Sequence, residues 1–337
     1  MDLRQLRYLV GIVQAGSLSR AAGQLHVAQS ALSHHLASLE CELDTRLVIR
    51  GRKGIALTEA GSVLYRHAEA ILRQLESAKQ ATKNAVNLPS GRVSIGFPTV
   101  LAPLLSYALF MRVRTEYPQI VLNVIDGNSS LVRERVLNGR LDIAVLYADQ
   151  RERGLAVEPL ASEELFYVTA DLDRSGIRIA DAAQRPLLLP GPGSTARRVA
   201  EEAFKEHGLA VASIGEINTL SALRRAIASG VGNAILSWAA LHDGERIIAL
   251  NYRRFVDAKL VRPVGLCFSE VGQRSPAVDA VANTLKSLVR ELVESGSWQG
   301  VSLTESSREP AHALVRQKPG RTSIRRSPSR RVSALRA

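Results

Sequence analysis

The chain has 337 residues, a formal net charge of +12 and 46% hydrophobic residues. This length is typical of two or three domains, and the apolar content excludes a chain that is disordered throughout. No apolar run approaches the roughly 18 residues of a membrane span, and the first residues lack the basic-then-apolar layout of a signal peptide. The two cysteines, Cys41 and Cys267, fall in different predicted domains, which argues against a disulfide. We therefore expect a cytoplasmic protein.

The positive charge is spread unevenly along the chain. Residues 301–337 hold nine basic and two acidic side chains, which is more than half of the net charge. Residues 91–300, with 24 basic and 23 acidic side chains, are close to neutral. The C-terminal segment has few apolar residues, three prolines and no periodicity, so we predict a basic disordered tail over 301–337. Either the tail adds nonspecific affinity for phosphate or it is an inert extension.

Residues 17–43 predict two short helices joined by a tight turn. Ser17 follows Gly16 and can cap the first helix with its hydroxyl, and small apolar residues then form a narrow stripe. In the second helix, leucines and Ala31 recur at helical spacing up to Leu43 and mark a buried side. The opposite side carries short hydrogen-bonding groups that can reach base edges in the major groove, unless it is an ordinary solvated face. These polar residues are Gln29, Ser30, Ser33, His34 and Ser38.

The flanking segments complete the outline of a winged helix. Residues 3–13 carry apolar side chains at helical spacing and predict a helix that braces the pair. Two brief strand-like runs, 47–50 and 55–57, enclose a glycine-containing basic tip. Basic residues there would lie beside phosphates or enter the minor groove, unless the tip is only a solvated turn. They are Arg50, Arg52 and Lys53.

From Thr58 the pattern predicts one long helix. Apolar and small side chains step alternately by four and three from Leu64 to Ala85, and such a 3.5-residue repeat favours close pairing of two helices. About 28 residues at ~1.5 Å each give an arm of about 40 Å. The alternative is a lone amphipathic helix packed on its own domain.

Residues 92 to about 300 alternate strand-like and helix-like segments, which predicts an α/β domain with a mostly parallel sheet. The first strands are expected at 92–97, 120–125 and 142–147, with helices near 101–115 and 129–138. A second set has strands at 165–169, 187–189, 214–217 and 234–236, and helices near 196–207 and 219–229. A strand at 262–269 and a helix at 277–293 complete the pattern.

Residues 1–61 contain specific motifs in LRQLRYLVGIVQAGSLSRAAGQLHVAQSALSHHLASLECEL, RLVIR and LTEAG. These segments resemble the N-terminal winged helix of LysR-type transcriptional regulators, and the resemblance extends to about residue 297. HVAQSALSHH, LVIRGRKGIALTEAG and VSIGF are most similar to the nitrogen assimilation control (Nac-like) group. One departure is His34-His35, where the family often has longer donors. Adjacent histidines on a helix point about 100° apart and cannot share a metal ion.

The resemblance implies the functional residues of the winged helix. The DNA-binding residues that it implies are Gln29, Ser30, Ser33, His34, Arg50 and Arg52, and we add Ser17 and Lys53 from their places at the helix start and the wing tip. It also implies double-stranded promoter DNA as a partner, a homodimer or homotetramer formed through the linker helix and regulatory domain, and contact with RNA polymerase.

The resemblance also implies the fold class. We expect an N-terminal all-α winged helix-turn-helix and a long linker helix, then an α/β two-lobed effector domain like a type 2 periplasmic binding protein. The expected boundaries are 1–58 for the DNA-binding domain, 59–90 for the linker and dimerisation helix, and 91–300 for the regulatory domain. Lobe 1 would cover about 91–160 and 264–300, and lobe 2 about 161–263.

A two-lobed domain of this kind places a ligand cleft at the carboxyl ends of its strands, where helix N-termini point amides at an anion. By the resemblance, we expect a small-molecule effector in this cleft. Each candidate contact has a plain alternative as a helix cap or a strand-end residue. The candidates are Thr99, Val100, Asn128, Ser129, Tyr147, Ser194 and Thr195.

Two other classes of function would explain part of the sequence. Gly191 to Ala196 fits a loose G-x-G-x-x-A, as a dinucleotide-using enzyme would need, but Pro192 inside the turn and its mid-chain position argue against that function. A small-molecule-binding module without DNA function would leave the wing and the long arm unexplained. No catalytic motif is present, so we predict no enzyme activity, no catalytic residue, no cofactor and no metal. The sequence predicts a LysR-type regulator that responds to a small-molecule or metabolic signal, and nitrogen supply is the candidate signal.

Overall fold

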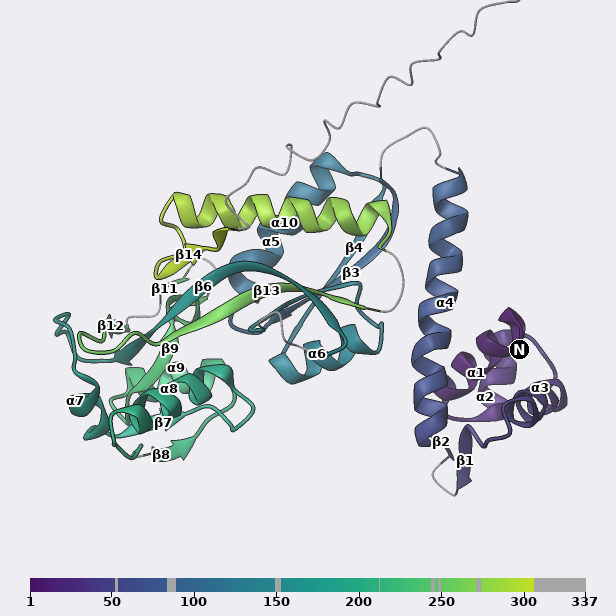
Figure 1. Ribbon diagram of the computed structural model, residues 1–337, viewed down its shortest axis with the longest axis horizontal. Coiled ribbons are helices and arrows are strands. Elements are labelled where there is room, and N and C mark those ends of the chain that lie inside the picture. The colour runs from purple at the N-terminus through teal and green to yellow at the C-terminus, as the bar shows by residue number, and fades with distance from the viewer. Residues whose placement is uncertain are drawn as a thin grey trace, which may run out of the picture.

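The structure is a computed structural model that describes residues 1–51, 54–83, 89–148, 153–211, 213–243, 246–247, 250–270 and 274–305. A small helical head, a long helix and a larger two-lobed α/β part follow one another along the chain (Figure 1). This is the fold class that the sequence predicts. In the described part of the chain, no helix is both long enough and apolar enough to cross a membrane. The wing residues Arg52 and Lys53 and the tail from residue 306 lie outside the described residues.

The head is built from three helices and a two-stranded hairpin. Asp2 starts the first helix through a capping box, because its carboxylate accepts from the Gln5 amide while the Gln5 side chain accepts from the Asp2 amide. Leu9, Ile12 and the buried leucines of the third helix form the core. The elements are α1 (Leu3–Ala15), α2 (Leu18–Leu25), α3 (Gln29–Glu42), β1 (Val48–Gly51) and β2 (Gly54–Leu57).

Two details of the head differ from expectation. Ser17 is the N-cap residue of α2, but its side chain makes no capping hydrogen bond, because its hydroxyl lies 3.2 Å from the Ser19 hydroxyl instead. Leu43 was expected on the buried side of α3, yet it follows the last helical residue and is 38% exposed.

The hairpin is fixed to the helices by backbone contacts. The Ile55 amide donates to the Gly16 carbonyl at 3.1 Å, and Glu40 accepts from the Leu47 amide at 2.7 Å. A Cβ on Gly61 would lie 1.8 Å from the Leu47 carbonyl oxygen, so only glycine permits this approach. The wing is therefore held in one position relative to α3.

The long helix α4 (Glu59–Lys83) touches both the head and the α/β part. Thr58 starts it by accepting from the Gly61 amide at 2.9 Å, as expected of an N-cap. Glu69 is buried and accepts from the Tyr65 hydroxyl at 2.7 Å and from Gln14 of α1 at 3.4 Å. Arg140 of the α/β part lies 3.8 Å from the same carboxylate. The predicted repeat beyond residue 83 lies outside the described helix.

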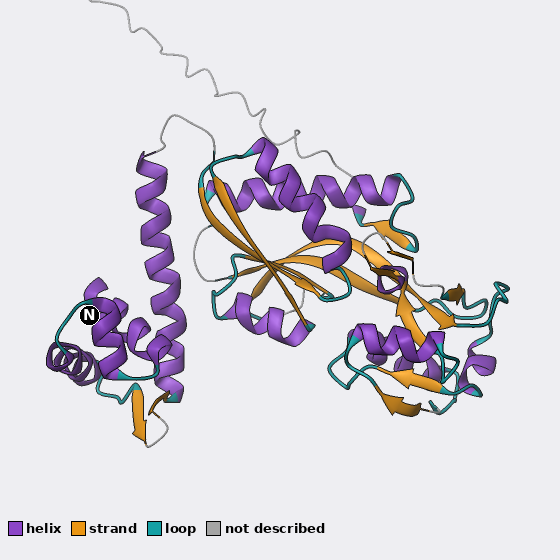
Figure 2. Ribbon diagram, turned by 180° about the vertical axis from the view of Figure 1, so that it is seen from behind, coloured by secondary structure: helices purple, strands orange, loops and turns teal. Residues whose placement is uncertain are grey.

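Lobe 1 contains the predicted parallel strands. β3 (Gly91–Pro98) pairs in parallel with β4 (Ile120–Gly127) and β5 (Ile143–Leu146). The helices α5 (Ala102–Glu116) and α10 (Pro276–Glu294) cover one face of the sheet, and α6 (Ser129–Leu137) covers the other (Figures 1 and 2). The eight-stranded sheet of the described residues has the order β12 (Asn251–Arg253), β6 (Leu155–Thr169), β13 (Val261–Ser269), β5, β3, β4, and β9 (Ala234–Ser237) and β14 (Val301–Leu303) also pair with β6.

Two long antiparallel strands connect the lobes. β6 (Leu155–Thr169) pairs with β13 (Val261–Ser269) along most of its length. The sequence predicted a strand only from residue 165, because Glu158, Glu163 and Glu164 interrupt the apolar pattern before it. β9 (Ala234–Ser237) and β12 (Asn251–Arg253) pair with the far half of β6 and begin lobe 2.

In lobe 2, α7 (Ile179–Ala183) and α8 (Thr195–Glu206) pack around Phe204, Tyr167 and the strand β7 (Leu187–Leu189). Its parallel pair β7–β8 matches the strands expected at 187–189 and 214–217 to within a residue. The remaining elements are α7 (Ile179–Ala183), β7 (Leu187–Leu189), α8 (Thr195–Glu206), β8 (Ser213–Glu216), α9 (Leu220–Ala228), the 3₁₀-helix η1 (Trp238–Leu241), β10 (His242–Asp243) and β11 (Arg246–Ile247).

The predicted start of the disordered tail is wrong. Residues 301–303 form the strand β14 (Val301–Leu303), which pairs antiparallel with β6. The Thr304 hydroxyl then lies 3.2 Å from the Pro159 carbonyl. The short apolar-polar-apolar run forms an edge strand of the sheet. Composition alone did not indicate this strand.

Candidate DNA interface and effector cleft

The candidate DNA-facing side of α3, called the recognition face below, is set by the burial of the leucines on the other side. Leu32, Leu36 and Leu39 are fully inside the head core, which leaves the other side of the helix to solvent. Gln29, Ser30 and His34 are exposed there, and Ser33 is half-buried. Amide, hydroxyl and imidazole groups at this spacing can donate to and accept from base edges.

The two adjacent histidines have different surroundings. The His35 ring packs edge-on against the ring of Tyr8, with centroids 5.1 Å apart. His34 is exposed on the recognition face. Within the described residues, no group of three His, Cys, Asp or Glu side chains could hold a metal ion.

The wing strand β1 brings a cation to the recognition helix. Arg50 donates from Nη2 to the Ser33 hydroxyl at 3.3 Å, so the structure brings these two predicted residues together. Arg20 and Arg46 are also exposed on the head, and the sequence analysis did not select them. A basic residue beside a predicted DNA-facing helix is the signal that would have found them.

A cavity of about 380 Å³ lies between the two lobes. Its walls come from the ends of β3, β4 and β5 in lobe 1 and from the loops before α8 and α9 in lobe 2. The structure brings all seven candidate effector residues to this one cavity, namely Thr99, Val100, Asn128, Ser129, Tyr147, Ser194 and Thr195.

Helix N-termini from both lobes face the cavity. The Asn128 side chain already caps α6 by accepting from the Leu131 amide at 2.7 Å. Ser194 and Thr219 are the N-cap residues of α8 and α9, but neither side chain makes a capping hydrogen bond. First-turn amides at such ends favour a negatively charged or hydrogen-bond-accepting group.

The floor of the cleft holds a buried ion pair that the sequence analysis missed. Arg262 of β13 is 4% exposed and pairs with Glu163 of β6, with 2.8 Å between Nη2 and Oε2. The guanidinium carbon lies 3.4 Å from the centre of the Tyr147 ring, and Nη1 donates to the Thr195 hydroxyl at 3.3 Å. Arg262 therefore connects lobe 1, the hinge strands and lobe 2.

The Tyr147 hydroxyl is the remaining polar group of this floor. It is buried and has no hydrogen-bond partner among the described residues. Burial raises the pKa of Tyr147 well above its ordinary value, so the phenol stays protonated and can donate to a ligand. Charged residues within the otherwise apolar segments ASEELFYVT and VRPVGLCFS, two glutamates in the first and one arginine in the second, were the sequence signal for the pair beneath Tyr147.

Comparison with family profiles decides the identity. Residues 3–62 match the bacterial regulatory helix-turn-helix protein, lysR family, and residues 87–290 match the LysR substrate binding domain. The chain belongs to the LysR family of transcriptional regulators. It is a sequence-specific DNA-binding regulator, as predicted.

Relatives of this LysR regulator match along its length. It is 37% identical over 305 residues to the nitrogen assimilation regulatory protein nac of Escherichia coli strain K12, covering 90% of this chain and all of that one. The nac protein of Klebsiella aerogenes gives the same identity and coverage. These relatives are regulators and not enzymes, so the predicted absence of a catalytic function stands and the dinucleotide alternative falls.

Solved LysR structures share the fold. A full-length OxyR variant from Pseudomonas aeruginosa superposes with a TM-score of 0.69 at 23% identity, covering 86% of this chain and 95% of that one. CbnR complexed with its target DNA gives a TM-score of 0.60 at 20% identity, covering 86% and 99%. The winged head followed by a two-lobed α/β domain is therefore the family's arrangement.

Proposed function

We propose that this LysR regulator controls promoters in response to a nitrogen-related metabolic signal. The observation that carries the proposal is the 37% identity to the nac proteins over their whole length. The proposed division is a DNA-binding domain over 1–58, a linker helix over 59–90 and a regulatory domain from 91, now extended through β14. Because it acts on chromosomal DNA, its place of action is the cytoplasm.

In this proposal α3 enters the major groove and the wing contacts the flanking backbone. Gln29, Ser30, Ser33 and His34 provide the base-reading groups, and Ser17 lies at the start of the neighbouring helix. Arg50 reaches phosphate beside Ser33, and phosphate contact is proposed for Arg52 and Lys53 as well. Phosphate contacts position the head, while the α3 side chains provide the sequence preference.

The proposed effector is a small polar molecule in the interlobe cleft. A cavity of about 380 Å³ is within the range of metabolite sites. The Tyr147 hydroxyl and the N-termini of α8 and α9 offer donors, and Val100 and Leu223 offer apolar contact. Closure of the lobes around such a ligand would act directly on the Arg262 network that joins them.

The proposed assembly is a homodimer or homotetramer. Ile71 of α4 is 40% exposed, as a helix that pairs with a second copy would leave it. On lobe 1, Tyr107 and Phe110 of α5 and Val121 of β4 form a further exposed apolar surface. Two paired heads would then read two half-sites, and a DNA-bound oligomer would be placed to contact RNA polymerase.

A promoter assay tests the proposed function. Purified protein is mixed with the DNA upstream of its own gene, and footprinting is repeated with and without glutamine, glutamate and ammonium. We expect protection of two half-sites about one or more helical turns apart. Transcript profiles of a deletion strain should change when nitrogen is limiting. Unchanged transcripts under nitrogen limitation, with changes under another starvation, would refute nitrogen control while leaving DNA binding intact.

A further inference from the structure

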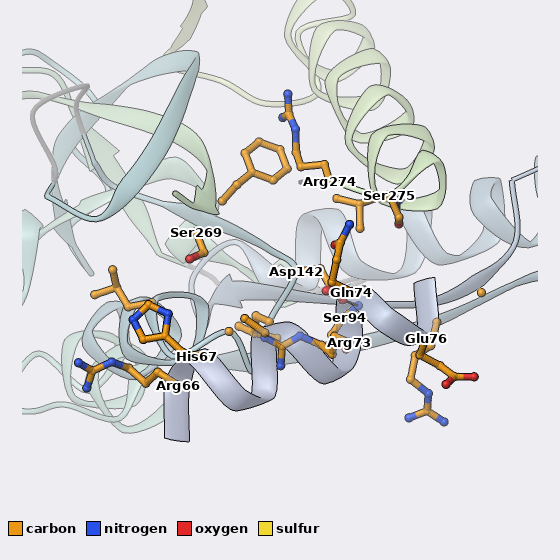
Figure 3. A pocket seen from close by; sticks show the side chains of 18 of the residues that line it. Arg66, His67, Arg73, Gln74, Glu76, Ser94, Asp142, Ser269, Arg274 and Ser275 are labelled. Carbon is orange, nitrogen blue, oxygen red and sulfur yellow. Dashed lines mark hydrogen bonds between the residues drawn. The ribbon is translucent and has the colours of Figure 1, made fainter. Parts of the chain in front are cut away.

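A second cavity of about 350 Å³ lies where α4 faces lobe 1. Its walls come from α4, the start of β3, the turn before β5 and the start of α10. It shares no lining residue with the interlobe cleft. Figure 3 shows Arg73 beside Ser94 and Asp142, with Arg274 and Ser275 across the cavity.

Basic residues outnumber acidic ones in the lining of this cavity by five to two. Four arginines and a histidine come from segments far apart in the sequence, and within the described part of the chain no carboxylate lies at ion-pair distance from Arg66, Arg73 or Arg92. Like charges gathered without partners raise the free energy of the empty cavity and attract anions. The basic residues are Arg66, His67, Arg73, Arg92 and Arg274.

The two acidic residues of the lining each have a hydrogen-bond or ion-pair partner. Glu76 lies 3.5 Å from Lys79 on its own helix. Asp142 accepts from the Ser94 amide at 2.7 Å, and burial raises the pKa of its carboxyl group. Arg274 is partly neutralised by Glu158 and Asp279. Because Asp142 also attracts Arg73, the positive charge that no carboxylate in the cavity balances comes mainly from Arg66 and Arg92.

A helix N-terminus adds to the positive potential. Ser275 caps the 19-residue helix α10, accepting from the Val278 amide at 3.3 Å, and Pro276 follows at the first turn. Both Ser275 and Val278 line the cavity. The positive end of the helix dipole therefore points to the same space as the arginines.

We propose that this cavity is a second binding site, for a small multivalent oxyanion such as a phosphorylated or polycarboxylate metabolite. Arg66 and Arg73 of α4 and Arg92 of lobe 1 bind it from opposite sides. Without the anion, the arginines of α4 and lobe 1 repel each other, against the attraction of Arg140 to Glu69 and to the Tyr65 ring. A bound anion contacts the arginines on both sides of the cavity. It therefore holds α4 and the DNA-binding head against the regulatory domain.

Calorimetry on the full-length protein tests the site, with pyrophosphate and citrate as probes in a phosphate-free buffer. We expect saturable binding of at least one probe, and stronger binding of pyrophosphate or of citrate identifies the phosphate or the carboxylate class. Arg73→Gln and Arg92→Gln should each raise the dissociation constant of the probe about tenfold, because the loss of one hydrogen bond to a charged group weakens binding by about that factor. Thermal unfolding of each variant checks that it remains folded, and Arg92 is exposed enough to be replaced without disturbing the core.

Two further variants separate this site from other positive surfaces. Arg225→Gln removes an exposed charge from α9 in lobe 2 and should leave probe binding unchanged. Tyr147→Phe alters the interlobe cleft and should also leave it unchanged. No saturable binding of either probe would overturn the proposal. So would equal weakening by Arg225→Gln, or a loss caused by Tyr147→Phe and not by Arg73→Gln.

Discussion

The recognition helix and the interlobe cleft use polar side chains in opposite ways. On α3, Gln29, Ser30 and His34 stand in solvent, and the helix is held by leucines on its other side. In the cleft, Arg262 and Glu163 are buried and take part in the contacts that hold the lobes together. Substitution on α3 should therefore change DNA affinity at nearly constant stability, whereas substitution beneath the cleft should change stability first.

The largest effect is expected from breaking the buried pair. Arg262→Met leaves Glu163 as a buried carboxylate without its cation, which should lower the free energy of unfolding by about 3–5 kcal/mol. Urea denaturation followed by circular dichroism measures this change. The matched control is Arg185→Gln, which removes an exposed pair with Asp171 at 3.2 Å and should cost less than about 1 kcal/mol. Equal losses of unfolding free energy in the two variants would contradict the distinction between the buried pair and the surface pair.

The head offers a comparison between two glycines. In Gly61→Ala the new Cβ would meet the Leu47 carbonyl oxygen at 1.8 Å, so we expect destabilisation of about 1–3 kcal/mol and a displaced wing. Gly23→Ala adds a methyl group with nothing within 4 Å and should stabilise α2 by about 0.5–1 kcal/mol. Thermal unfolding of both variants measures these two changes in stability. A stable Gly61→Ala protein with normal DNA binding would show that the wing tolerates movement.

Removing the basic tail should have a smaller effect, on salt dependence alone. Truncation belongs after Glu305, because β14 ends at Leu303 and Thr304 contacts β6. The shortened protein should fold normally, and the dependence of its DNA affinity on salt concentration should become less steep. An unchanged salt slope in fluorescence anisotropy would show that the tail does not touch phosphate.

The smallest effect concerns the two thiols, one in each region. Cys41 of α3 is exposed, whereas Cys267 of β13 is buried and burial raises its pKa to about 12. At neutral pH a thiol reagent should label only Cys41 in the native protein and both after denaturation. Because the folded pKa of Cys267 lies above the unfolded value, its contribution to stability is present at neutral pH and is lost as pH rises towards 12. Rapid labelling of Cys267 in the native protein would contradict the burial of this thiol.

Local periodicity explains why the head was predictable. The leucine spacing predicted a second helix with one buried side up to Leu43, and α3 covers Gln29–Glu42. Parallel strands β3, β4 and β5 followed from short apolar runs between helical segments. Such patterns depend on neighbours in the chain, so they can be read without knowledge of tertiary structure.

The cleft floor and the sheet edge depend on partners far apart in sequence. Glu163 and Arg262 are 99 residues apart, and each looks like a surface charge until β6 and β13 pair. β14 is a strand only because β6 presents a free edge to it. The grouping of Thr99, Tyr147 and Thr195 around one cavity was expected from family resemblance and not from any spacing.

The most direct test of DNA reading by α3 compares specific with nonspecific affinity in a Ser33→Ala, His34→Ala variant. Anisotropy titrations use the footprinted upstream site and a random duplex of equal length, with Ser229→Ala of lobe 2 as the control. The account predicts that specific affinity falls about tenfold or more, since a good base contact contributes about 1–3 kcal/mol, while nonspecific affinity and thermal stability stay constant. An equal loss on both duplexes, or none on either, would contradict it.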